Sequence, residues 1–512
     1  MTRKHLGLLT AWSLLVGACD HPDPYDAGLQ ILPPVTTRDG LVWPDRSRDQ
    51  LIFALPAGDD LQILHAPAGD QHSDLAWAIA SRDRSSVLAL TVPASAKEED
   101  VDEQLLRFPA DGDGDPVVYD VHAPFSAAAL SPDLRRAILY FGGAGGSEQL
   151  HNANQIAIVD LKGEGVQNIT LNGFGGVLSS VEFPGQLTEG EPTPILIGGA
   201  NYDIAAFLAA SEVVLMNMDD PQLDQVAVPL GPDIGFTPVR TLLRPGNPLF
   251  ADPALFVLSS SGHEVGMLSL LPEGDGAGFT AQISLISVGQ SAADFVFHDT
   301  ATVPYLVTVD ASAAALVFTD IRTQGGFTVP LGAPASRLLL RDSDSGRQVV
   351  AWAEGGAQLS TLELAGIDDS LGRKPAHLKI ETGIDSLVQL DNDRLLIASS
   401  INLYVVDLPD EQVTPLSAMT PYSASSSALV GERLLLGTAG QSWVSTVDLA
   451  TLNPESMLLD GAIESFHYLP GPKRIVVTHA DSVGHLTVVD PSEPSRKTSR
   501  VHWGFLLQGV LD

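Results

Sequence analysis

The sequence contains a single cysteine, Cys19, and few basic residues: Lys and Arg number 28 against 63 Asp and Glu, which gives a formal net charge of -35. One cysteine excludes a disulfide framework and any metal site built from several cysteines. The shortage of positive charge argues against DNA or RNA as partners, because phosphate backbones require a basic surface. We therefore expect no nucleic-acid partner.

Several signatures of enzyme sites are also missing. The chain has no G-x-S-x-G nucleophile elbow, no H-E-x-x-H zinc motif and no glycine-rich phosphate loop. Charged residues make up 18% of the chain and hydrophobic residues 44%, which is too apolar for a disordered protein. Beyond the N-terminal segment we find no amphipathic helix of about 12 residues or more. The 47 Gly and 35 Pro residues are typical of the frequent turns of an all-β protein.

The first 18 residues have the features of a secretory signal peptide. Arg3 and Lys4 form a basic start, residues 6–16 are mostly apolar, and two small residues end the segment. The apolar stretch is shorter than the about 20 residues of a membrane-spanning helix. We therefore predict export out of the cytoplasm.

Cys19 follows this signal directly. Residues 15–19 (LVGAC) resemble the lipobox of bacterial lipoproteins, except that Val16 stands where those signals prefer Leu. The resemblance implies that Cys19 is lipidated and anchors the chain to a membrane of the cell envelope, inner or outer, with the domain on the periplasmic side or otherwise outside the cytoplasm. Residues 19–40, rich in Pro and Asp, are predicted to be an extended tether. The alternative is an ordinary signal peptide that happens to contain a cysteine.

A strand-like repeat runs through the rest of the chain. Each copy is an alternating apolar run that ends in an acidic or polar residue followed by an apolar one, and successive copies are 41 to 57 residues apart. A looser copy near Phe108 and a partial unit at residues 50–66 precede the others. The eight clear copies are at residues 155–161, 212–218, 264–270, 315–321, 358–364, 402–408, 443–449 and 485–491.

Each copy has two apolar strands before it and a weaker strand after it. Residues 386–390 and 394–398, joined by the polar turn 391–393, show the first two, and residues 411–416 show the last. Four short strands per unit predict the blade of a β-propeller.

The units resemble the WD-repeat-like and YVTN-type propeller superfamily over nearly all of residues 40–512. The WD dipeptide and the tryptophan repeats of quinoprotein propellers are absent, so the resemblance is architectural and implies no cofactor. We predict an all-β domain at residues 41–512, a single propeller of about eight blades with a range of seven to nine, because propellers commonly have no more than about eight. One or two copies would then be insertions or ring-closing strands. Two smaller propellers are the alternative.

Two kinds of acidic position stand out, and we predict a structural role for both. Residues 111–115 (DGDGD) carry acids at alternate positions as calcium loops do, but lack the glycine and glutamate that such loops need further on, which favours a plain turn between strands. The second kind ends the repeat strand, where a carboxylate accepts hydrogen bonds from backbone N–H groups of the following turn. Its members are Asp160, Asp320, Asp407, Asp448 and Asp490.

Histidines gather near the C-terminus. His479 and His485 flank a predicted hairpin, with His467 and Asp481 close in sequence. Such a set can bind zinc weakly, but isolated polar residues at strand ends are the usual content of propeller turns. We predict no metal site.

Loop length suggests one binding face. Three early units have long loops between the second and third strands, at residues 93–103, 142–154 and 198–211, whereas later units close the same hairpin in about four residues. Neutral drift of surface loops is the alternative, because insertions there are tolerated cheaply. The candidate binding residues in these loops are His151, Asn154, Tyr202, Phe207 and Leu208.

Two functions from different classes follow. The first is a non-enzymatic, envelope-anchored binding or scaffold lipoprotein that presents a propeller face to a protein or peptide partner. The alternative is a propeller hydrolase or lyase acting on sugars or lactones, which requires acids and histidines converging from the first strands. The first strands contain scattered acidic and basic side chains that match no ligand pattern: Glu182, Arg240, Asp294, Arg337, Glu464 and His467.

Overall fold

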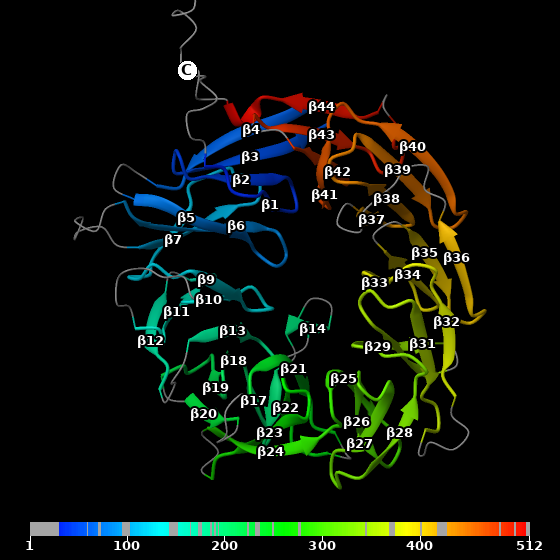
Figure 1. Cartoon of the computed structure of the whole chain (residues 1–512). Helices are drawn as coiled ribbons and strands as arrows, with labels where there is room; N and C mark the ends of the chain where they lie inside the picture. The colour runs from blue at the N-terminus through cyan, green and yellow to red at the C-terminus, as the bar shows by residue number, and fades with distance from the viewer. Residues whose placement is uncertain are drawn as a thin grey trace, which may run out of the picture. The chain divides into compact units, whose positions relative to one another are not determined.

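The described part of the chain consists of strands, turns and one short 3-10 helix (Figure 1). No helix within it is long and apolar enough to cross a membrane. The computed structural model describes residues 30–58, 60–69, 73–94, 103–142, 152–163, 165–172, 177–184, 187–188, 191–192, 194–222, 225–230, 236–247, 250–274, 278–343, 346–367, 374–399, 402–416, 427–480, 483–495 and 498–507.

Within these residues lie ten four-stranded antiparallel sheets, the blades of a β-propeller, from β1-β2-β3-β4 to β41-β42-β43-β44. The all-β propeller prediction is therefore confirmed, whereas the predicted count of about eight blades is wrong. All eight clear repeat copies, the looser copy near Phe108 and the partial unit at residues 50–66 each supply strands to a blade of their own. The common upper limit on blade number led us to discount copies that the repeat itself contains.

The chain divides into two compact units. The first comprises Met1–Pro124, Leu469–Val488 and Arg500–Asp512. Its first strand begins at Val35, within the range predicted as tether. The elements of this unit are β1 (Val35–Thr36), β2 (Leu41–Asp45), β3 (Gln50–Ala57), β4 (Asp60–Pro67), β5 (Ser73–Ala80), β6 (Ser86–Pro93), β7 (Gln104–Pro109), β8 (Val117–Asp120), β42 (Arg474–His479), β43 (His485–Val489), β44 (Arg500–Trp503) and the 3-10 helix η2 (Phe505–Leu507).

The second unit comprises Phe125–Tyr468 and Val489–Ser499. Its first three blades contain β9 (Ala127–Leu130), β10 (Arg136–Tyr140), β11 (Gln155–Asp160), β12 (Val166–Thr170), β13 (Leu178–Glu182), β18 (Ile204–Ala209), β19 (Glu212–Asn217), β20 (Gln225–Pro229), β21 (Pro238–Arg244), β22 (Ala254–Ser259), β23 (Glu264–Pro272) and β24 (Phe279–Ser287).

The next four blades of this unit follow the same order. They contain β25 (Ala292–Asp299), β26 (Pro304–Asp310), β27 (Ala315–Asp320), β28 (Gly326–Pro330), β29 (Arg337–Ser343), β30 (Gly346–Trp352), β31 (Gln358–Glu363), β32 (Ala376–Lys379), β33 (Ser386–Gln389), β34 (Arg394–Ala398), β35 (Leu403–Asp407), β36 (Gln412–Leu416), β37 (Ser427–Val430), β38 (Arg433–Gly437), β39 (Trp443–Asp448) and β40 (Asn453–Leu458), and β41 (Ile463–Leu469) comes after them.

Burial explains why the second and third strands carry the sequence signal. Every residue of β22 and of β26 is buried, because blades stack face to face and cover both sides of these strands. Such strands are continuous apolar runs. The fourth strands alternate instead, as β28 does, since one of their faces meets solvent. The core of the second unit accordingly lies between neighbouring blades, where Leu208 of one blade and Leu255 of the next share a cluster.

An insertion separates the first and second strands of the blade β13-β18-β19-β20. It contains the short strands β14 (Leu187–Thr188), β15 (Glu191–Pro192), β16 (Ile195–Ile197) and β17 (Ala200–Tyr202), paired as two small hairpins. The hairpin β16–β17 packs on the neighbouring blade β21–β24. A Cβ on Gly198, which has a φ of 58°, would lie 2.6 Å from Cβ of Pro272 in β23. Only glycine fits this turn without strain.

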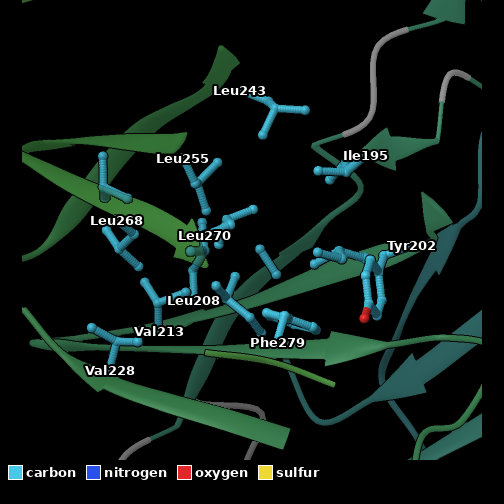
Figure 2. Close-up of a cluster of buried hydrophobic side chains, with 14 of the residues drawn as sticks. Ile195, Tyr202, Leu208, Val213, Val228, Leu243, Leu255, Leu268, Leu270 and Phe279 are labelled. Carbon is cyan, nitrogen blue, oxygen red and sulfur yellow. The ribbon is translucent and has the colours of Figure 1, made fainter. Parts of the chain in front are cut away.

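This insertion corrects the prediction of a binding loop at residues 198–211. The range is not a loop between second and third strands, because it contains β17 and the second strand β18. Tyr202, Phe207 and Leu208 are 6%, 0% and 2% exposed. Figure 2 shows Tyr202 and Leu208 among the buried side chains, with Phe279 of the next blade beside them. Side chains this buried are not accessible to a partner, so all three residues belong to the core.

The run IAAFLA at residues 204–209 misled the prediction because it lacks polar alternation and follows two glycines. Of the other two candidates, Asn154 lies in the turn before β11, where its backbone N–H donates to Oδ1 of Asn152 at 3.1 Å. His151 lies outside the described residues, as does Cys19.

The aspartates at the ends of the third strands cap the turns that follow. Oδ1 of Asp448 accepts the backbone N–H groups of Ala450 and Thr451 at 3.0 and 2.9 Å. These hydrogen bonds hold the pKa of Asp448 below its ordinary value. The same bonding at the other four positions confirms the predicted structural role: Asp160 with Lys162 and Gly163, Asp320 with Arg322, Asp407 with Asp410, and Asp490 with Ser492.

The acidic segment 111–115 lies between β7 and β8. It is a turn between strands, as the sequence predicted. Oδ1 of Asp111 accepts the N–H of Asp113 at 3.3 Å. Gly112 has a φ of 66°, and a Cβ there would lie 2.9 Å from the ring of Phe53. This turn therefore packs on the core of the first unit.

Candidate functional site

The first strands of four successive blades in the second unit bring together charged side chains that are far apart in sequence. Strands β13, β21, β25 and β29 carry Glu182, Arg240, Asp294 and Arg337. These are four of the six first-strand residues that the sequence offered. Contacts made by these residues or by their neighbours in the strands link them into one series, which we call the inner-strand row.

Asp294 is the buried residue of the inner-strand row, held in place by backbone hydrogen bonds. Its side chain is 2% exposed. Oδ1 accepts the N–H of Phe295, and Oδ2 accepts the N–H of Leu338 on the next blade, both at 2.8 Å. The carboxylate therefore has backbone partners on two strands that hold it in one orientation.

Arg240 forms an ion pair through Nη1 with Oδ1 of Asp294. Its guanidinium also lies over the ring of Phe295, with Cζ 5.5 Å from the ring centroid. The side chain of Arg240 is 34% exposed, so one edge of the guanidinium is fixed and the rest reaches solvent. Burial lowers the pKa of Arg240, and the nearby charge of Arg337 lowers it further.

Register shifts in the first strands place these groups. The pairing of β21 with β22 slips between Pro238 and Arg240, and that of β25 with β26 slips between Ala292 and Asp294. A bulge of this kind turns the following side chains to the other face of the strand. The two bulges therefore determine that Arg240 faces Asp294.

Arg337 continues the row on β29. Its Nε and Nη2 both lie near Oε1 of Glu354, at 2.9 and 2.7 Å. Glu354 lies in the turn between β30 and β31. The two side chains are 53% and 59% exposed, so this pair is open to exchange with other ions.

Glu182 lies on the other side of β21. Thr241 donates a hydrogen bond from Oγ1 to Oε2 of Glu182. Burial raises the pKa of Glu182, which favours its protonated form at a higher pH than an exposed glutamate. Arg240 and Thr241 are consecutive in a strand and point to opposite faces, so β21 contacts β25 through one and β13 through the other.

The remaining two first-strand candidates, Glu464 and His467, both lie on β41 and are not part of the row. His467 of β41 has its Nε2 2.6 Å from Oγ of Ser465 in the same strand. In the first unit, the rings of His479 and His485 are tilted by 31° with centroids 3.9 Å apart, and His485 stacks on Trp503. No group of three or more His, Cys, Asp or Glu able to hold a metal occurs in the described part of the chain.

Sequence reasoning missed a pocket of about 210 Å³ beside the insertion of the second unit. Arg136 of the preceding blade crosses to this site, pairing with Asp203 and, at 2.9 Å, with Oδ1 of Asp219. Burial raises the pKa of Asp203, although Arg136 opposes the shift. The pocket is smaller than the about 300–1,000 Å³ of sites for whole small molecules. Its walls include Asp133, Phe183, Ile195, Tyr202, Asp203 and Asp219.

Comparison with known proteins does not assign the chain to a family. No family model and no curated protein matches the sequence. Similar solved structures include the dihydro-heme d1 dehydrogenase NirN, with 13% identity over 69% of this chain and 70% of that chain and a TM-score of 0.41. The Dos1 propeller has 14% identity over 68% and 88%, with a TM-score of 0.39. The Cps50 (Swd1) β-propeller domain of Myceliophteria thermophila has 11% identity over 65% and 96%, with a TM-score of 0.33. No site residue or activity is carried over from them.

Proposed function

We propose that this protein is an envelope-anchored, non-enzymatic binding propeller that holds a protein or peptide partner at the inner-strand row. In this proposal Cys19 carries the lipid, and the second unit presents Arg240 and Arg337 to the partner outside the cytoplasm. The LVGAC segment supports the anchor. The absence of known catalytic motifs from the sequence is consistent with binding rather than catalysis.

One observation carries the proposal. Arg240 is fixed by a buried carboxylate and an aromatic ring, yet a third of its side chain is exposed. An arginine needed only to tie two blades together could be fully covered, as Arg244 is at 2% exposure in the same strand. An oriented guanidinium with N–H groups toward solvent is instead suited to recognising an acceptor group on another molecule.

Affinity purification from membranes of the native host tests the proposal. The tagged full-length chain is compared with Arg337→Gln and with Arg240→Lys, which keeps the charge beside Asp294 but removes the planar fork. Arg347→Gln is the matched control, because Arg347 is a half-exposed arginine paired with Asp342 in the same unit. Wild type and control should recover the same partner, and both site variants should recover at least several-fold less. Equal recovery by all four proteins contradicts the proposal.

A hydrolase or lyase remains the second candidate, and Glu182 is the observation that favours it. A glutamate whose pKa is raised by burial is a possible general acid. Release of a product from a sugar or lactone substrate that is lost in Glu182→Gln, with partner recovery unchanged, would favour the enzyme over the binding protein.

A further inference from the structure

We propose that the inner-strand row binds a carboxylate group of the partner, with Arg240 and Arg337 as the two binding residues. Asp294 is then a positioning residue, and Glu354 is an internal competitor that occupies Arg337 until the partner's carboxylate replaces it. This inference rests on the proposed binding function and names the chemistry that the site recognises.

The first argument is the geometry around Asp294. Its Oδ1 contacts Nη1 of Arg240, while Oδ2 accepts the N–H of Leu338, the residue next to Arg337. Asp294 thus fixes one guanidinium and the backbone that carries the other. Burial lowers the pKa of Arg240, and the charge of Arg337 lowers it further. An anion bound to both guanidiniums stabilises them, because it offsets their mutual repulsion.

The second argument is the present partner of Arg337. Oε1 of Glu354 accepts from both Nε and Nη2 of that arginine, so a carboxylate oxygen occupies this edge of the guanidinium. Both side chains are more than half exposed, and exposed ion pairs contribute only about 0–1 kcal/mol. Glu354 therefore shows which chemical group the site accepts and is held too weakly to exclude a competitor.

The third argument separates a carboxylate from a phosphate. The chain has a net charge of -35, and Glu182, Asp294 and Glu354 all lie along the row. A phosphate monoester carries about -1.5 to -2 charges at neutral pH, and each added charge increases repulsion from these groups. A carboxylate brings one charge and matches the fork of an arginine. Val239, the neighbour of Arg240, is 57% exposed, so an apolar group beside the carboxylate has a surface to contact.

Calorimetric titration of the full-length protein with four short peptides tests the inference. The first peptide, Gly-Ser-Val-Ala-Leu, has a free C-terminal carboxylate, and the second is its C-terminal amide. The third is the amide with a central Glu, and the fourth is the amide with a central phosphoserine. We expect the first or third peptide to bind, which also identifies the source of the carboxylate, and the second not to bind. Binding of the amide as tightly as the carboxylate peptides, preference for phosphoserine, or no carboxylate binding at millimolar concentration overturns the inference.

Variants distinguish the three roles. Glu354→Gln should tighten binding of the carboxylate peptide by about 1.5- to 5-fold, the range expected for freeing a cation from an exposed ion pair. Arg337→Gln should abolish binding, and Arg347→Gln should leave it unchanged. Asp294→Asn, measured below its unfolding temperature, should reduce the preference for carboxylate over amide, which a purely structural role would not alter. Weaker binding in Glu354→Gln overturns the competitor role.

The two proposals fail separately. If partner recovery depends on Arg240 and Arg337 while no peptide shows a carboxylate preference, the binding site stands and its carboxylate chemistry is wrong. If partner recovery is independent of both arginines, the proposed function itself fails.

Discussion

The guanidinium of Arg240 in β21 and the carboxylate of Asp294 in β25 form an ion pair between the first strands of two successive blades. The two residues are distant in sequence, and the backbone N–H of Leu338 in the following blade joins the same carboxylate. One buried side chain therefore ties three strands together and leaves an arginine side chain about one-third exposed. We therefore expect the stability of this region to depend on Asp294, and in our proposal its capacity to bind depends on the same residue.

Asp294→Asn should destabilise the protein, because an amide leaves Arg240 without its counter-charge and cannot accept both backbone N–H groups equally well. Hydrogen bonds to charged groups contribute about 1.5–3 kcal/mol, so we expect a loss of about 2 kcal/mol in urea unfolding. The matched control is Asp342→Asn, whose carboxylate is 82% exposed and pairs with Arg347. That control should change stability by less than about 0.5 kcal/mol. Equal effects of the two substitutions would show that Asp294 has no special role.

Leu208→Ala and Leu196→Ala test the corrected position of residues 198–211. Leu208 is 2% exposed in β18, whereas Leu196 is 58% exposed in the inserted hairpin. Truncation of a buried leucine lowers the free energy of unfolding by about 2–5 kcal/mol, whereas truncation of an exposed one changes it by no more than about 0.5 kcal/mol. Denaturant unfolding of the two variants should differ accordingly. Similar small losses of stability in both variants would contradict the burial of Leu208.

The sequence predicts the repeat unit well because the third strand of each blade repeats its apolar run, and five of the described blades also have an aspartate at or just after the end of that strand. Burial on both faces dictates the run, and the following turn dictates the aspartate, as at Asp448. Both are local requirements.

The inner-strand row follows from no such local rule. Its first-strand residues were identifiable as a scattered set, but which of them meet depends on the bulges in β21 and β25. A shift of one residue turns each side chain to the opposite face, so the pairing of Arg240 with Asp294 cannot be read from spacing. The β16–β17 hairpin was missed for a related reason, since it is an insertion that no other blade repeats.

The pH dependence of stability should change in Glu182→Gln. Burial raises the pKa of Glu182 in the folded protein. A raised carboxyl pKa destabilises the fold at pH values above the folded pKa, and the penalty disappears as the pH falls to the unfolded value of about 4.3. The variant, which still accepts a hydrogen bond from Thr241, should therefore be more stable than wild type at pH 7 and equal to it near pH 4. A difference that grows as the pH falls contradicts the raised pKa.

The lipid anchor depends on Cys19. Labelled palmitate should mark the full-length chain, and Cys19→Ser should abolish the label and release the protein from membranes. A Cys19→Ser protein that stays with the membrane after a salt wash would contradict the lipoprotein proposal.

The central claim, that the inner-strand row is the binding surface, is tested most directly by hydrogen exchange of the full-length protein alone and with the partner recovered by affinity purification. Our account predicts that the partner slows exchange in segments 236–244, 292–299 and 337–342 and in the turn at residues 353–357. The outer strands β24, β28 and β32 should exchange as before. Protection confined to those outer strands, with none at the first strands, would contradict the account.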